Sequence, residues 1–222
     1  MKATKAKIII VISVIISFVS IVIVVLDTFI PSIIKAPLDL PINDSTITLE
    51  DSIPHDSKAL FIDIEEFFIP SGYLGDAENN GIKMFKNNTF DCLGKNPCFK
   101  FVYSPKTYSW GGLYWQYGEN NWGERKGIDL SNKGISKVTF WAKGEKGGET
   151  ILFKAGGIIG RLYNDSFESS IEISLTVEWK QYSIDLKGKD LSNVIGGFCW
   201  VISGGKNYGI TTFYIDRIRY EK

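Results

Sequence analysis

Ten short apolar segments recur between residues 60 and 220, and this recurrence limits the folds open to the chain. Turn signals containing glycine, asparagine or proline separate each segment from the next. The segments are 60–64, 82–85, 99–103, 112–117, 137–142, 150–155, 170–175, 180–186, 196–202 and 211–220. After residue 30 the sequence shows no convincing helical period of ordinary length. It therefore predicts an all-β domain over residues 59–222, an antiparallel sandwich or jelly roll.

The first 27 residues differ from the rest of the chain. Lys2, Lys5 and Lys7 precede an uncharged run of 19 residues, 8–26, which Asp27 ends. This length is close to the roughly 20 residues that a helix needs to cross a bilayer. The alternative is a cleaved signal peptide, but the run is longer than the usual apolar region of one and no A-x-A-like cleavage site follows it. We therefore predict one uncleaved N-terminal transmembrane helix.

The charges beside this run predict its orientation. The lysines precede it and an acidic residue follows it, which places the N-terminus in the cytoplasm. The predicted localisation is the cell membrane, single-pass, with the C-terminal domain extracytoplasmic. The predicted domains are cytoplasmic lysines and anchor over 1–27, an extracytoplasmic linker over 28–58 that contains four prolines, and the folded domain over 59–222. The single histidine, His55, falls in the linker, where we expect it to be solvated.

Charge and cysteine content narrow the possible partners. Lys+Arg equals Asp+Glu at 25 each, so no basic excess points to nucleic acid.

Cys92 and Cys98 lie six residues apart in a turn-rich stretch, and an oxidising compartment favours a disulfide between them. The alternatives are two free thiols or half of a metal site, although no second Cys or His cluster completes a zinc tetrahedron. Cys199 lies in an apolar segment and is expected to be buried.

Residues 110–123, WGGLYWQYGENNWG, hold three of the chain's six tryptophans beside amide and carboxylate side chains. Aromatic faces next to planar hydrogen-bonding groups suit a sugar ring, although an aromatic core strand with a polar turn has the same composition. Alternation places Leu113, Trp115 and Tyr117 toward the core and Tyr114 and Gln116 on the other face. The alternative is a bulge at Gly111–Gly112, which would reverse this assignment.

The candidate ligand-binding residues are aromatic or amide side chains expected on strand faces and loop rims. Trp141 qualifies because it falls on the polar face of segment 137–142, between Thr139 and Lys143. The full set is Tyr73, Tyr114, Gln116, Asn120, Asn121, Trp122, Trp141 and Trp200. Catalysis has little support, because the chain has no Ser–His or Cys–His pair beyond linker His55. The sequence does not place any two carboxylates as a glycosidase requires.

Three stretches resemble carbohydrate-binding modules of the jelly-roll, galactose-binding-like superfamily. They are LFIDIEEFFIPSGYLGD (60–76), WKQYSIDLKGKDLSNVIGGFCW (179–200) and TTFYIDRIRYE (211–221). GLYWQYGENNWG and KVTFWAKGEKGGE resemble an extracytoplasmic prokaryotic subgroup of these modules. The resemblance covers about residues 60–221. It implies a jelly-roll β-sandwich with sugars lying across the concave sheet or at the loop rim.

The same resemblance implies a structural Ca²⁺ between the first and last strands. Asp216 matches the C-terminal acidic position, and Asp63, Glu65 or Glu66 is the implied N-terminal partner. The predicted metal set is Asp63, Glu65 and Asp216. Arg217 stands where the family usually has a second acidic or polar residue, so it can neutralise Asp216 instead.

Together these features predict a membrane-anchored, extracytoplasmic, non-catalytic module that binds a glycan or cell-envelope polymer. The alternatives are a structural or protein-interaction module of the envelope and a glycan-active hydrolase. Asn43, Asn87 and Asn164 each begin an N-x-S/T sequon, which suits an exposed exterior and means glycosylation only in a host that has the machinery.

Overall fold

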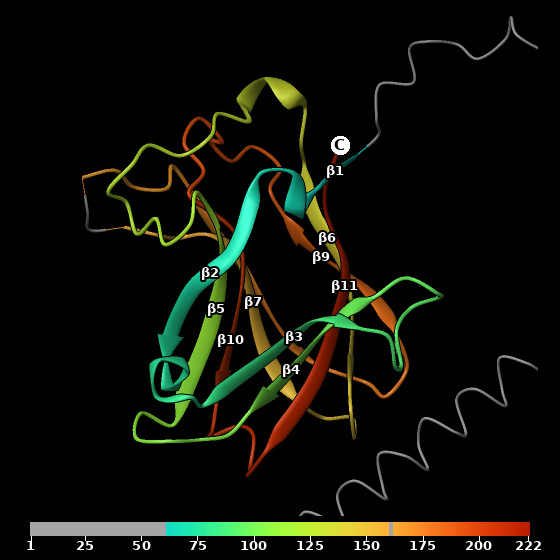
Figure 1. Cartoon of the computed structure of the whole chain (residues 1–222). Helices are drawn as coiled ribbons and strands as arrows, with labels where there is room; N and C mark the ends of the chain where they lie inside the picture. The colour runs from blue at the N-terminus through green and yellow to red at the C-terminus, as the bar shows by residue number, and fades with distance from the viewer. Residues whose placement is uncertain (1–60, 160–161) are drawn as a thin grey trace, which may run out of the picture. The chain divides into compact units, whose positions relative to one another are not determined.

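The computed structural model describes residues 61–159 and 162–222, which form eleven strands and three 3₁₀ helices (Figure 1). The strands are β1 (Phe61–Asp63), β2 (Phe68–Gly75), β3 (Ile82–Asn88), β4 (Cys98–Tyr103), β5 (Trp110–Tyr117), β6 (Lys137–Gly144), β7 (Thr150–Gly156), β8 (Glu168–Ser174), β9 (Lys180–Asp185), β10 (Gly196–Ser203) and β11 (Thr211–Glu221). The 3₁₀ helices are η1 (Ile64–Glu66), η2 (Asp76–Asn79) and η3 (Ser131–Lys133). In these residues no helix is long and apolar enough to span a membrane. The predicted anchor, the linker and Asn43 lie outside the described residues.

The strands form two antiparallel sheets that face each other, so the predicted sandwich is confirmed. The first sheet has the order β3-β4-β11-β6-β9, and β1 also pairs with β11. The second sheet has the order β2-β5-β10-β7-β8. β11 is the longest strand: its first half pairs with β4 and its last three residues pair with β1. All ten predicted segments are strands.

The sequence did not predict β2. Pro70 and the pair Ser71–Gly72 indicate a turn, but here they lie within a strand at the edge of the second sheet. An edge strand tolerates proline because one side of its backbone has no partner. The pairing of β2 with β5 shifts register between Pro70 and Gly72, and this bulge absorbs the irregular residues.

Interlocking aromatic rings from both sheets fill the space between them. Trp115 and Trp200 come from the second sheet and are fully buried. The ring centroid of Trp200 lies 4.9 Å from those of Phe101 and Phe213, which come from the first sheet. Trp115 meets Phe99 edge-to-face at 5.3 Å. Leu113, Trp115 and Tyr117 belong to or pack against this core, as alternation predicts.

A smaller apolar cluster covers the outer face of the second sheet. Tyr114, Ile158, Ile195 and Cys199 form it, and Trp122 packs against it. Asp165 holds the loop that follows β7 in place, because its buried carboxylate accepts the backbone N–H groups of Ile158, Ile195 and Gly196. Tyr114 and Gln116 thus lie on the predicted outer face, but loops cover them. Cys199 is buried, as predicted.

The carboxyl of Asp165 predicts that stability falls as pH rises toward neutrality. Burial raises its pKa from 3.8 to about 6, more than its N–H bonds lower it. A carboxyl whose pKa is raised on folding stabilises the protein fully below its unfolded pKa, and this contribution is lost as pH rises through 6. We expect the free energy of unfolding to be about 1 to 2 kcal/mol lower at pH 7.5 than at pH 5. Urea unfolding at both pH values measures it, and Asp165→Asn should flatten the difference; an unchanged difference would contradict the assignment.

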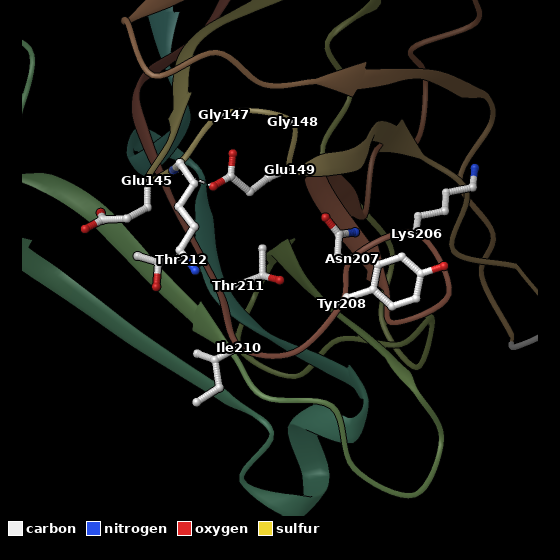
Figure 2. Close-up of a pocket in the computed structure, with 11 residues that line it drawn as sticks. Glu145, Gly147, Gly148, Glu149, Lys206, Asn207, Tyr208, Ile210, Thr211 and Thr212 are labelled. Atoms are coloured by element: carbon white, nitrogen blue, oxygen red, sulfur yellow. Dashed lines mark hydrogen bonds between the residues drawn. The ribbon is translucent and has the colours of Figure 1, made fainter.

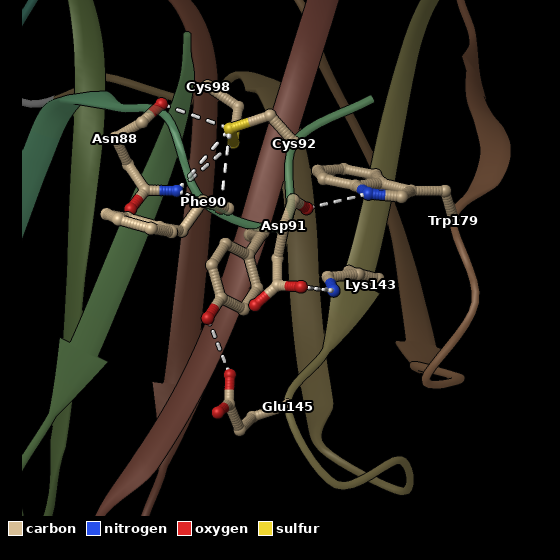
Figure 3. Close-up of polar contacts among 9 residues, drawn as sticks. Asn88, Phe90, Asp91, Cys92, Cys98, Lys143, Glu145 and Trp179 are labelled. Carbon is tan, nitrogen blue, oxygen red and sulfur yellow. Dashed lines mark hydrogen bonds and ion pairs between the residues drawn. A yellow bond between two sulfur atoms is a disulfide. The ribbon is translucent and has the colours of Figure 1, made fainter. Parts of the chain in front are cut away.

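The predicted disulfide between Cys92 and Cys98 is confirmed, and its loop lies over the outer face of the first sheet (Figure 3). The carbonyl of Asp91 accepts the indole N–H of Trp179 at 2.9 Å, and its carboxylate lies 3.8 Å from the ammonium of Lys143. The same ammonium lies 4.8 Å from the ring centroid of Tyr214. The disulfide loop therefore covers Tyr214, an outward-facing aromatic residue of β11 that is buried as a result.

Candidate functional site

One end of the sandwich carries two adjacent hollows with exposed apolar side chains. Three connections meet there: 104–109 between β4 and β5, 145–149 between β6 and β7, and 204–210 between β10 and β11. We call this the loop end; it is at the bottom of Figure 1. The first hollow has a volume of about 460 Å³ and the second about 700 Å³. Tyr208 and Ile210 line both hollows and are 92% and 66% exposed.

Asn207 fixes the loop that presents Tyr208. Its side-chain amide donates to the carbonyls of Thr150 and Ser203, and its side-chain oxygen accepts the Thr150 N–H at 2.9 Å. Asn207 therefore satisfies both backbone groups of Thr150, at the start of β7, and is itself buried. Lys206 pairs with Glu172 of β8. These bonds tie the loop to the second sheet, so the backbone that carries Tyr208 is anchored while its side chain faces solvent.

Glu149 lines the first hollow and shapes the 145–149 connection to which it belongs (Figure 2). Its carboxylate accepts the Lys146 N–H at 2.7 Å. Its other oxygen is buried without a hydrogen-bond partner in the described part of the chain. This oxygen occupies the space beside Gly144, where a Cβ atom would lie 1.7 Å from it. The absence of a side chain at position 144 thus lets the carboxylate enter the end of the sandwich.

Asp76 fixes the third connection of the loop end. Its buried carboxylate accepts the backbone N–H groups of Lys106 and Tyr108 at 2.8 and 2.7 Å and the hydroxyl of Tyr103 at 3.2 Å. Burial acts to raise the pKa of Asp76, but these bonds outweigh it, and the pKa lies below its usual value. The partner hydroxyl has its pKa raised to about 12 by burial and by this carboxylate. The wall of the second hollow is therefore built on one buried, ionised side chain.

The polar groups of the first hollow suit the hydroxyls of a neutral ligand. Lys146 and the backbone of Gly147 and Gly148 are exposed there, and Thr212 is half-buried. Positively and negatively charged side chains lie beside an exposed aromatic ring. Such side chains can hydrogen-bond the hydroxyls of a sugar while the ring packs against its apolar face. Figure 2 shows the side chain of Glu145 pointing away from Glu149, so the two carboxylates of this hollow do not converge.

Five of the predicted ligand-binding residues lie in β5 and in the connection that follows it, toward the opposite end of the sandwich. Gln116 is fully buried and bonds the Ser71 hydroxyl and the carbonyl of Asn121. Asn121 is also buried and closes its own turn through four side-chain hydrogen bonds. Tyr114 is 5% exposed and donates its hydroxyl to the carbonyl of Gly156. The prediction that these three side chains contact a ligand is therefore corrected. They have structural roles, because loops close over their face of the sheet.

The other two residues of this group, Trp122 and Asn120, keep some exposed surface, and the last three predicted residues lie on other parts of the domain. Trp122 is half-buried and meets Tyr114 edge-to-face, and Asn120 is exposed beside it. Trp141 is half-buried on the outer face of the first sheet, opposite Asp216 in the register. Tyr73 is 39% exposed on edge strand β2. Trp200 is a correction: its side chain points into the core and has no exposed surface.

Sequence reasoning missed Tyr208, the most exposed aromatic residue in the described chain. Its sequence context could have indicated this exposure. Tyr208 lies in GGKNYGI, a stretch between two apolar segments that shows no alternation of apolar and polar residues. Aromatic residues in glycine-rich connections have no strand face to fill.

The predicted calcium ligands are not gathered into a cation site in this structure. The Glu65 carboxylate lies 2.6 Å from the ammonium of Lys86, and that of Asp63 lies 3.9 Å from the guanidinium of Arg219. Burial raises the pKa of Asp216, and the charges of Arg217 and Arg219 act against this. Within residues 61–159 and 162–222, no three His, Cys, Asp or Glu side chains form a metal-binding group. One buried oxygen of Asp216 has no hydrogen-bond partner there, and calcium at this position stays a prediction.

Comparison with solved structures finds several similar domains. A family 30 carbohydrate-binding module is 18% identical with a TM-score of 0.47, over 74% of this chain and 88% of that one. A family 11 module from Clostridium thermocellum, solved with a β-1,3-1,4-mixed-linked tetrasaccharide, is 17% identical with a TM-score of 0.48, over 72% and 94%. A family 61 module solved with β-1,4-galactotriose is 20% identical with a TM-score of 0.40, over 72% and 94%.

These similar structures are carbohydrate-binding modules. Their sequence identities to this chain are 17 to 20%, and their TM-scores all lie below 0.5. No protein-family model and no curated protein sequence matches the chain.

Proposed function

We propose that the described domain is a jelly-roll carbohydrate-binding module that binds glycan at the loop end without cleaving it. The observation that carries this proposal is the presentation of Tyr208, which is 92% exposed between two hollows. A tyrosine on a loop without anchoring hydrogen bonds would have no fixed position relative to the two hollows. Here the Asn207 side chain ties the loop to β7, so a ligand that stacks on the ring does not first have to order the loop backbone.

The proposal extends to where the module acts. The uncharged run 8–26 anchors the chain in the membrane, and the domain lies on the extracytoplasmic side, where polymers of the cell envelope are its ligands. The Cys92–Cys98 disulfide supports this location, because disulfides persist in oxidising compartments.

Binding without cleavage is favoured by the arrangement of the carboxylates in the first hollow. Glycoside hydrolysis needs two carboxyl groups that flank one bond of the sugar. Glu145 accepts the hydroxyl of Tyr214, on the outer face of the first sheet, and points away from Glu149 (Figure 2). Glu149 is 8% exposed and engaged by the loop backbone. Neither is placed as half of such a pair.

Tyr208→Ala is expected to weaken glycan binding about fivefold, because one aromatic ring contributes roughly 1 kcal/mol of stacking. Calorimetric titration with the two oligosaccharides that the similar modules bind, followed by an array of envelope polysaccharides, measures the effect. Unfolding curves confirm that the variant is folded, since position 208 makes no core contact.

Trp122→Ala is the matched control at the opposite end of the sandwich. We expect it to leave affinity unchanged. If this replacement abolishes binding while Tyr208→Ala does not, then the ligand lies on the loop that carries Asn120, Asn121 and Trp122, which are among the residues predicted from the sequence. If no glycan binds the wild-type domain, the interpretation as a protein-interaction module of the envelope replaces this one.

A further inference from the structure

A small hollow beside the disulfide loop contains an asparagine within a glycosylation sequon. The hollow has a volume of about 350 Å³ and is lined by Phe85, Asn87, Asn88, Thr89 and Phe90. Three of these residues, Asn87, Asn88 and Thr89, form an N-x-T sequon. The hollow lies where β3 ends and its pairing with β4 shifts register, between Phe85 and Asn88. The sequon therefore sits at an irregular strand end rather than inside a regular ladder.

Two exposed phenylalanines flank this sequon. Phe85 is 48% exposed and Phe90 is 79% exposed, although both belong to a domain with a well-filled core. Exposed aromatic residues that gather around one concave site mark a surface that something covers. The hollow lies immediately around Asn87, so a group attached to that side chain is the nearest available cover.

The shape of this hollow is fixed by the neighbouring residue and the disulfide. The amide of Asn88 donates to the carbonyl of Phe90 and lies 3.4 Å from the sulfur of Cys92 and 3.6 Å from that of Cys98 (Figure 3). Asn87 and Thr89 are exposed, and their side chains make no hydrogen bond within the part of the chain that the structure describes. The middle residue of the sequon, Asn88, therefore has a structural role, whereas Asn87 and Thr89 are accessible to solvent.

The sequon at Asn164 provides an internal comparison. Its hydroxyl residue, Ser166, donates to the carbonyls of Asp190 and Asn193 at 2.7 and 3.2 Å. Its middle residue, Asp165, is buried and holds the loop in place. In the folded protein a transferase therefore meets an engaged hydroxyl at this sequon and an accessible one at Asn87.

We propose that Asn87 carries an N-linked glycan whose first sugar packs against Phe85 and Phe90. The proposal rests on the extracytoplasmic location given above and is independent of ligand binding at the loop end. The donor is a lipid-phosphate-linked oligosaccharide, used by a transferase of the host. The side-chain nitrogen of Asn87 forms a bond to the anomeric carbon of the sugar, and the bond from that carbon to the phosphate oxygen breaks. The lipid phosphate leaves as the anion, and the amide loses one proton.

Peptide mass spectrometry on the full chain purified from the cells that produce it tests the modification. After reduction, trypsin releases Asn87 in peptide 87–95 and Asn164 in peptide 162–180. We expect peptide 87–95 to carry the mass of a glycan and peptide 162–180 to be bare. Asn87→Gln and Thr89→Ala should both abolish the added mass. An unmodified peptide 87–95 overturns the proposal, whatever the state of peptide 162–180.

A double-mutant comparison in the same cells tests the packing of the sugar on the two rings. We expect Asn87→Gln to lower the Tm in the wild-type background and to have no effect when Phe85 and Phe90 are already alanine. Equal shifts in the two backgrounds would show that the sugar does not touch the rings. Failure of either test does not bear on glycan binding at Tyr208, because that binding is measured separately, by titration of a ligand at the loop end.

Discussion

Asp76→Ala is expected to lower the free energy of unfolding by about 3 kcal/mol and to release the 104–109 connection. The replacement leaves two backbone N–H groups and the Tyr103 hydroxyl without the acceptor that they share. Part of this cost is recovered, because water can reach the backbone of Lys106 and Tyr108, which are exposed residues. Urea unfolding monitored by tryptophan fluorescence measures the change. A loss below about 1 kcal/mol would show that the connection is held by other contacts.

The same variant is expected to lose an acid-sensitive part of the wild-type stability. The pKa of Asp76 is lowered on folding, so its contribution is present above the unfolded pKa and disappears as pH falls through the folded pKa, below 3.8. Wild-type protein should therefore destabilise more steeply than the alanine variant between pH 4 and pH 2. Asp76→Asn is the matched control: it keeps one acceptor oxygen and should lie between the two in stability. Parallel pH profiles for wild type and Asp76→Ala would refute an ionised carboxylate at this position.

Trp200→Ala should cost about 3 to 5 kcal/mol, the usual range when a large aromatic side chain is removed from a core. Trp200 is fully buried between Phe101 and Phe213, so its removal leaves a cavity where the two sheets meet. Calorimetric melting and urea unfolding both report the loss. A cost near zero would mean that the tryptophan is not in the core.

Trp200→Phe separates a core role from a ligand role at the same position. The indole N–H of Trp200 has no hydrogen-bond partner in the described residues, so phenylalanine removes an unsatisfied donor while keeping most of the apolar volume. We expect a smaller loss of stability than with alanine and unchanged glycan affinity per folded molecule. A folded Trp200→Phe protein that no longer binds glycan would return this tryptophan to the binding site.

The sequence was informative about strands because strand signals are local. Alternation in segment 112–117 correctly placed Leu113 and Trp115 in the core and Tyr114 and Gln116 on the outer face. Turns between the segments could also be predicted, because the glycine, asparagine and proline residues that favour them act locally. The failure at β2 is also local: Pro70 and Gly72 are turn residues, and only the edge position, set by distant pairing with β5, makes a strand acceptable there.

The candidate site was harder to predict because exposure depends on distant parts of the chain. Alternation states which face a side chain is on, but not which loop covers that face. Tyr114 is outward and still buried, because the connection anchored by Asp165 closes over it. Tyr208 is exposed because Asn207 bonds a strand 57 residues earlier in the chain. No short window of sequence contains either relationship.

The position of β11 has a consequence for how the protein is made. This strand joins β6 to both β4 and β1 in the first sheet, yet it is synthesised after the other ten strands described. The first sheet cannot close until β11 has left the ribosome and, in the proposed topology, until this strand has been translocated. Until then β4 and β6 present unpaired edges, so folding is slow and depends on contacts between distant residues. In the proposed topology, the edges of β4 and β6 must therefore be protected during export until β11 pairs with them.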